Sequence, residues 1–127
     1  MWAETFVAGY QIPADWANSL YELMNDLGLE WPNRCYLGYW RGKPVATSNI
    51  FIGAGVAGIQ CVATLEEARR RGFGAAITAA PLLDAQAIGC KIGILQSSDL
   101  GRRAYERVGF RQVCQMEHFY RNLTLPI

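Results

Sequence analysis

The chain has 127 residues and is 51% hydrophobic, which is enough for one domain with a real hydrophobic core. Its formal net charge of +1 gives no overall attraction to nucleic acids or membrane surfaces, so we expect neither as a partner. No apolar run is long enough to span a bilayer, and the first residues, MWAETFVAGYQ, lack the segments of a signal peptide, so we expect a cytoplasmic protein.

The N-terminal half predicts a helix followed by three strands. Apolar residues recur at helical spacing within 12–29, and Gly28 provides a stop signal. RCYLGYW and PVATSNIFIG flank the turn RGK and indicate a hairpin. VAGIQCVATL, residues 56–65, is almost continuously apolar and suits a central strand.

The C-terminal half predicts helices alternating with strands. A long helix is expected over 66–88, with a kink near Ile77 or a division into two pieces because Pro81 removes a backbone hydrogen bond. KIGILQSS indicates a buried strand, DLGRRAYERVG a short helix, and QVCQMEHFYR a last strand. No repeat or linker interrupts the pattern, so residues 1–127 are expected to form a single domain.

Four cysteines, Cys35, Cys61, Cys90 and Cys114, are widely spaced among apolar neighbours. No pair has C-x-x-C spacing and no histidine cluster accompanies them, so we expect no metal site. The sequence favours reduced, mostly buried thiols that act as small hydrophobic residues.

The stretch EEARRRGFGAAITAA places the densest positive charge of the chain directly before two glycines. The first turn of a helix presents free N–H groups at the positive end of its dipole, and Gly72 and Gly74 allow a phosphate to approach the backbone. A solvated helix start with glycines for tight packing is the alternative, but it does not explain arginines at the positive end. The Walker and dinucleotide glycine patterns are absent.

Two segments of the chain carry a family resemblance. VATLEEARRRGFGAA resembles the acetyl-CoA motif Q/R-x-x-G-x-G/A of the GCN5-related N-acetyltransferases. SSDLGRRAYERVGF resembles the family's next motif, with Ser98 where many members have Asn, Tyr105 seven residues later, and Gly109 and Phe110 at its end. The resemblance covers about residues 35–120.

The resemblance implies an α/β fold with a mixed, largely antiparallel sheet and helices on both faces. The chain departs from the family in that we expect no counterpart of its usual first strand. The strand at 58–64 should lie beside the strand at 91–97 and diverge from it. Acetyl-CoA or CoA would then place its pantetheine arm in the cleft and its pyrophosphate on the N–H groups of 70–75. The implied cofactor-binding residues are Val62, Ala63, Thr64, Arg69, Arg70, Arg71, Gly72, Phe73, Gly74, Ala75 and Ser98.

The resemblance also implies the chemistry, which is direct attack of a neutral amine of a small molecule or peptide on the acetyl thioester. A backbone N–H near Val62 or Ala63 would hold the developing oxyanion, and Tyr105 would protonate the departing thiolate. The alternative for Tyr105 is a packed helix residue whose hydroxyl is bound locally.

No general base is identified. Family members often have a Glu on the central strand, where this chain has Gln60. Glu66 and Glu67 are expected to be helix-capping charges, and His118 a packed or edge residue of the last strand. Two features favour an alternative function. The central strand has no acid, and the pattern begins after the position of the family's first strand. The alternative is a non-catalytic CoA-binding or regulatory module that is the silent or partial half of a larger acetyltransferase. The sequence leaves open the acceptor amine, a homodimer, and whether the chain is the C-terminal part of a longer protein.

Overall fold

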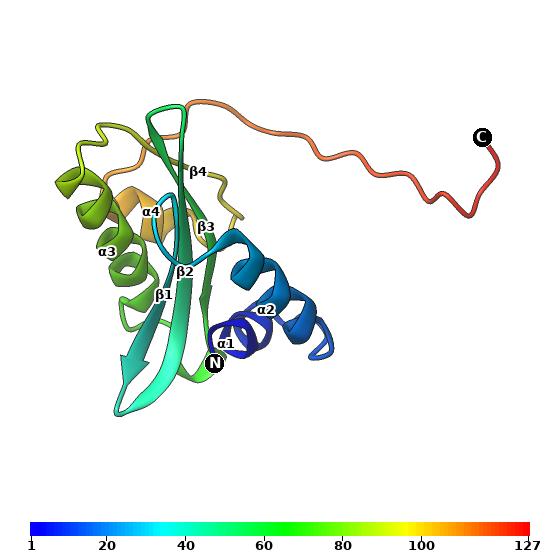
Figure 1. Ribbon diagram of the computed structural model, residues 1–127, viewed down its shortest axis with the longest axis horizontal. Coiled ribbons are helices and arrows are strands. Elements are labelled where there is room, and N and C mark those ends of the chain that lie inside the picture. The colour runs from blue at the N-terminus through cyan, green and yellow to red at the C-terminus, as the bar shows by residue number, and fades with distance from the viewer.

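The computed structural model describes all residues, 1–127, and contains a four-stranded sheet with helices on both faces (Figure 1). In chain order the elements are α1 (Trp2–Tyr10), α2 (Trp16–Leu27), β1 (Asn33–Trp40), β2 (Lys43–Gly53), β3 (Val56–Thr64), the 3₁₀ helix η1 (Glu66–Ala68), α3 (Phe73–Ala87), β4 (Gly93–Leu95) and α4 (Arg102–Val108). The sheet order is β1-β2-β3-β4, with two antiparallel pairs and a parallel β3–β4 pair. The expected mixed, largely antiparallel sheet is therefore confirmed, and no helix has the length and apolar character to cross a membrane.

Strand β3 contributes to the packing on both faces of the sheet because it contains a bulge. Ala57 and Ile59 are buried in a cluster with Ala85 of α3, whereas Ala63 is buried against α1. Simple alternation would put all three odd-numbered residues of β3 on one face. Cys61 has a φ of 52° and the pairing register shifts beside it, so the residues that follow change face.

Helix α3 covers one face of the sheet and runs unbroken through Pro81. The ring of Pro81 leaves the carbonyl of Ile77 without its normal helical donor. The buried hydroxyl of Ser48 in β2 donates to that carbonyl at 2.7 Å, so the proline is compensated by a neighbouring strand. The expected division of this helix at the proline is wrong.

The long helix expected over 66–88 is also wrong at its start. Residues Glu66–Ala68 form only the short η1, and α3 begins at Phe73. Between them Arg69 is extended, and Arg70 and Gly72 have φ values of 62° and 82°. These backbone angles are incompatible with a right-handed helix, so the arginines lie in a loop before the helix.

The N-terminal helix α1 is the main element that the sequence did not predict. Its rings at i, i+4 spacing stack on one another, with centroid distances of 5.6 Å for Trp2–Phe6 and 5.1 Å for Phe6–Tyr10. The indole N–H of Trp2 donates to the Ser48 carbonyl at 3.0 Å, which fixes the helix on the sheet. The expected helix within 12–29 is confirmed as α2, although of its residues only Met24 is buried.

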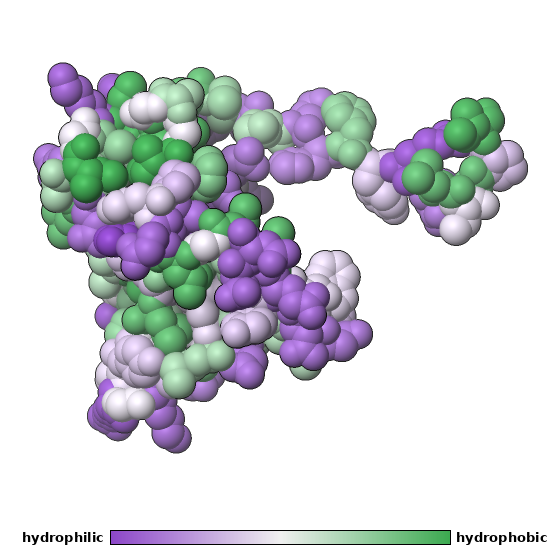
Figure 2. Space-filling model, in the orientation of Figure 1, coloured by the Kyte–Doolittle hydropathy of each residue, from purple (hydrophilic) through white to green (hydrophobic).

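The last strand expected over 112–121 is wrong. Residues 111–127 are all exposed and form no strand, and they leave the body of the molecule as an extended segment (Figure 1). Hydrophobic side chains stand clear of the body along this segment (Figure 2). Strand β4 is likewise shorter than its apolar pattern indicated, with only Gly93–Leu95 paired. Alternating apolar residues form a strand only where a neighbour completes their backbone hydrogen bonds.

Candidate active site

Strands β3 and β4 lie side by side and then part. They are paired only from Ala57 with Gly93 to Ile59 with Leu95, after which β3 continues to Thr64 beside β2 and without β4. The expected neighbouring, diverging strands are confirmed. Beyond Ile59 the edge of β3 that faces β4 has no strand partner, so the backbone groups that no other part of the chain binds can bind a ligand. The Thr64 carbonyl is already bound, because it accepts from Arg69.

The loop after β3 and the first turn of α3 present a run of free N–H groups. No backbone or side-chain acceptor of the chain receives the N–H groups of the six residues from Arg70 to Ala75. Gly72 has a left-handed φ of 82°, which suits glycine, and a Cβ built on it meets nothing within 4 Å. A Cβ built on Gly74 meets only Ala104 at 3.7 Å. The loop therefore offers open backbone donors at the positive end of a helix.

Arg69 does not face this open surface. Its Nε donates to the Thr64 carbonyl at 3.1 Å, and its Nη2 donates to the Gly9 carbonyl at 2.8 Å. The side chain thus ties the end of β3 to the last turn of α1, where a cation also complements the helix dipole. Arg70 and Arg71 are exposed, and none of the three arginines has a carboxylate partner in the chain.

Tyr105 lies on α4 with its ring half-buried. The ring crosses Gly101, where a Cβ would come within 2.9 Å of Cε2, and it packs edge-on against Phe110 at 6.3 Å. No group of the chain binds its hydroxyl, and the oxygen is not sealed from solvent. The ring is packed, as the alternative for this residue expected, but its hydroxyl is not bound locally. Burial, and to a smaller extent the neighbouring Tyr10, raises the pKa of Tyr105 above its usual value, which keeps the phenol protonated.

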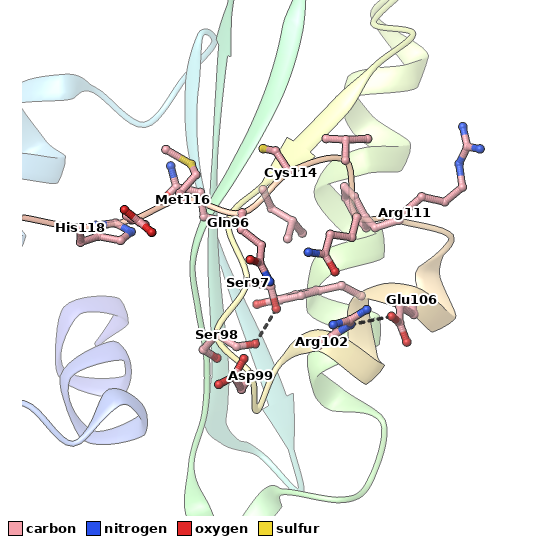
Figure 3. Close-up of a pocket in the computed structure, with 17 residues that line it drawn as sticks. Gln96, Ser97, Ser98, Asp99, Arg102, Glu106, Arg111, Cys114, Met116 and His118 are labelled. Carbon is pink, nitrogen blue, oxygen red and sulfur yellow. Dashed lines mark hydrogen bonds and ion pairs between the residues drawn. The ribbon is translucent and has the colours of Figure 1, made fainter.

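A groove of about 410 Å³ lies beside Tyr105, between the end of β4, α4 and the extended C-terminal segment (Figure 3). Ser98 lines it and starts the turn into α4, because its Oγ accepts the Gly101 N–H at 3.3 Å. On the α4 side, Arg102 and Glu106 pair at 2.9 Å. His118 also lines the groove, from the extended segment and not from a strand, and Figure 3 shows it far from that pair.

Val62 and Ala63, whose backbone N–H groups are expected to hold the oxyanion, lie outside the groove beside Tyr105. Val62 is half-buried and packs toward α3, and Ala63 is buried beneath α1, so only their backbone groups can face a ligand. Gln60, where an acid would stand, is exposed.

The cysteines are free, as expected, but not equally covered. Cys35, Cys61 and Cys90 are half-buried, whereas Cys114 is exposed on the C-terminal segment, so its expected burial is wrong. Burial, with a smaller effect from Cys35, raises the pKa of Cys61 to about 11. Burial similarly raises the pKa of Cys35. These two thiols are poor nucleophiles at neutral pH.

Sequence reasoning did not single out Tyr10, Trp40 or Arg41. Tyr10 ends the aromatic series of α1 and contributes to the raised pKa of Tyr105. Trp40 and Arg41 lie in the β1–β2 hairpin, where Trp40 packs against Phe73 of α3 with ring centroids 6.1 Å apart. The spacing of aromatic residues at 2, 6 and 10 was the available signal for Tyr10. The turn sequence WRGK was the signal for the hairpin.

Known proteins match the chain in family and in fold. The acetyltransferase (GNAT) family model matches residues 1–110. The fold is similar to an aminoglycoside 6'-N-acetyltransferase from Acinetobacter haemolyticus (14% identity, 94% of this chain and 91% of that one, TM-score 0.72). It is also similar to glucosamine-6-phosphate N-acetyltransferase from Arabidopsis thaliana (16%, 94% and 90%, 0.71).

A third similar structure is a predicted acetyltransferase from Clostridium acetobutylicum, crystallised with acetyl-CoA (16% identity, 84% of this chain and 75% of that one, TM-score 0.67). No curated protein matches the chain in sequence. These structural likenesses concern the fold, and the family model covers most of the chain. The chain therefore belongs to the acetyltransferase (GNAT) family.

Proposed function

We propose that the chain is an acetyl-CoA-dependent N-acetyltransferase of the cytoplasm that acetylates a primary amine of a small molecule or peptide. The observation that carries the proposal is the run of N–H groups without acceptors from Arg70 to Ala75, next to the unpaired edge of β3. Coenzyme A has both complementary parts, since its pyrophosphate needs donors and its pantetheine amides pair with an extended backbone.

In this proposal the cofactor lies along the loop and the cleft. The pyrophosphate sits on the N–H groups of 70–75, and the pantetheine arm pairs with the edge of β3 at Val62–Thr64. Ser98 lies in the loop between β4 and α4, on the β4 side of the cleft. The similar Clostridium structure that contains acetyl-CoA supports this cofactor class.

The reaction is direct transfer. The lone pair of the neutral amine forms a C–N bond to the acetyl carbon, and the C–S bond of the thioester breaks. A backbone N–H near Val62 or Ala63 stabilises the oxyanion of the tetrahedral intermediate. The thiolate takes a proton from Tyr105, whose raised pKa and free hydroxyl suit a donor. The amine nitrogen loses a proton to water, and the Tyr105 phenolate regains one from water.

The test is Tyr105→Phe, which keeps the ring in place and removes the proton donor. Turnover, followed as thiol release from acetyl-CoA with a panel of amines, should fall by about 10²–10⁴-fold. CoA affinity and thermal stability should stay near wild type. Tyr39→Phe, on the outer strand β1, is the matched control and should leave turnover unchanged. Full activity of Tyr105→Phe would remove the acid role, and equal losses of binding and stability would make the hydroxyl structural.

The second candidate is a non-catalytic CoA-binding module. It is favoured by the composition of β3, which has no carboxylate and an exposed Gln60 where family members often have an acid. The two candidates differ in one measurement, because the module binds CoA without releasing thiol from acetyl-CoA for any amine in the panel. Turnover in the wild-type chain eliminates it.

We also propose that the chain forms a homodimer through its C-terminal segment. Val113, Phe119 and Tyr120 are at least 89% exposed on this segment, and β4 is an edge strand with no outer partner. An exposed edge and an unpaired apolar segment complement each other between two copies. Light scattering should give a dimer for the full chain and a monomer for residues 1–111. A monomeric full chain at high concentration would contradict this.

A further inference from the structure

A second cationic site lies next to the run of free N–H groups, on the tip of the β1–β2 hairpin. The Arg71 guanidinium carbon lies 4.4 Å from the centroid of the Trp40 ring, and that of Arg41 lies 4.8 Å from it. Arg41 comes from the hairpin turn, where its φ is 51°, and Arg71 comes from the loop before α3. Two segments that are 30 positions apart therefore bring their guanidinium groups to one indole.

The two guanidinium groups are uncompensated. Neither forms a salt bridge, and both side chains belong to exposed residues. Their carbons are at most about 9 Å apart, because both lie over one ring, and this is inside the roughly 10 Å screening length at 0.1 M salt. The exposed Lys43 pairs with Trp40 across the hairpin and adds a third cation. Like charges gathered without a counterion form a favourable place for an anion.

Packing of the indole alone does not explain the arrangement. A single arginine over the half-buried Trp40 already gives the cation–π attraction, and a second one adds repulsion. Stacking on the indole instead holds two guanidinium groups in place. Each is a forked donor, and such donors match a phosphate. Trp40 also contacts Phe73, whose own N–H belongs to the free run. The cationic hairpin and the backbone donors are thus neighbouring parts of one surface.

We propose that Arg41 and Arg71, held on Trp40, bind the 3'-phosphate of coenzyme A. The inference rests on the proposed function, in which the pyrophosphate occupies the backbone donors of 70–75. Coenzyme A carries two separate anionic groups on its ADP part, the 5'-pyrophosphate and the 3'-phosphate. The surface offers two separate donor sets, one of backbone N–H groups and one of guanidinium groups, and the second is left for the 3'-phosphate.

The experiment compares CoA with 3'-dephospho-CoA by calorimetry. The wild-type chain should bind CoA at least about 10-fold more tightly, the worth of one charge-assisted hydrogen bond. In the double variant Arg41→Gln/Arg71→Gln this preference should fall to about twofold or less, because the affinity for CoA drops while that for dephospho-CoA is kept. Lys91→Gln removes one charge before β4, beside the start of β3 and away from the loop that follows its end, and should keep the full preference.

Each other outcome has a distinct meaning. Equal wild-type affinity for the two ligands would overturn the 3'-phosphate site and leave the proposed function standing. Equal weakening of both ligands in the double variant would assign the arginines to the pyrophosphate and also overturn the inference. No binding of either ligand to the wild-type chain would contradict the proposed function itself. Thermal melting of the double variant within about 2 °C of wild type would show that folding is intact.

Discussion

Replacement of Gly74 by alanine separates the role of this residue in folding from its role in binding. Gly74 is the second residue of α3 and has no positive φ, so alanine fits its backbone. The added Cβ would lie 3.7 Å from the Cβ of Ala104, which is an ordinary contact. The folded chain has room for the methyl group, whereas a phosphate seated on the N–H groups of this turn does not.

Gly74→Ala should raise the stability of the fold and lower the affinity for CoA. Alanine in place of a helical glycine should stabilise the fold by about 0.5–1 kcal/mol, a rise in melting temperature of about 2–5 °C. Loss of one or two hydrogen bonds from backbone N–H groups to a charged phosphate should weaken CoA binding by about 10- to 100-fold. Gly74→Val, with a larger and branched side chain, should weaken binding further. The variant should therefore be the more stable protein and the poorer binder.

The assay combines calorimetry with CoA and thermal melting without ligand. Gly72→Ala is the first comparison, because its φ of 82° should make alanine destabilising as well as detrimental to binding. Ala87→Gly, an exposed position in the last turn of α3, is the second, and should lower stability without affecting CoA. Gly74→Ala that binds CoA within twofold of wild type would refute close approach of a phosphate at this residue.

Further predictions concern the hydrogen bond from Tyr36 to Asp84 and the cysteines. Tyr36→Phe removes the 2.6 Å bond that joins β1 to α3 and should lower the free energy of unfolding, measured in urea, by about 1–2 kcal/mol. Burial and this bond raise the pKa of Tyr36 from 10.0 to about 12, so its contribution is complete below pH 10 and is lost as pH rises through 12. Wild type should therefore lose stability in this window and Tyr36→Phe should lose less; parallel curves would contradict the assignment. In alkylation at pH 8 followed by mass spectrometry, exposed Cys114 should react fastest and Cys61, with its pKa of about 11, far more slowly; equal rates would show that β3 opens readily.

The sheet could be predicted well because its strands carry strong local patterns. The apolar runs before Thr64 and around Ile94 indicated two strands, and the family resemblance placed them side by side; their short parallel pairing is confirmed. The expected burial of the second strand is wrong, because Ile94 is 56% exposed and no residue of β4 is buried. The N–H groups of the glycine loop have no acceptor in the chain. Its binding role and that of Tyr105 stay predictions, since they depend on a ligand.

The structure differs from the sequence prediction where contacts between distant parts of the chain decide the local conformation. Glu66–Ala68 and α3 were joined into one helix, because positive φ values at Arg70 and Gly72 cannot be predicted from helix-forming neighbours. Helix α1 is held by a bond from Trp2 to β2, which lies 46 positions away. The strand expected over 112–121 has the right alternation but no partner, and alternation alone does not form a strand.

The bulge at Cys61 makes the length of β3 as critical as its composition. Deleting one residue at the bulge would turn every later side chain of β3 to the opposite face of the sheet. Ala63 would turn away from Phe6 and Val7, and the groups on the free edge of the strand would be exchanged as well. The exposed turn at Ala54 and Gly55 has no such constraint. Among homologous chains, insertions and deletions should therefore collect in that turn and be absent between Val56 and Thr64.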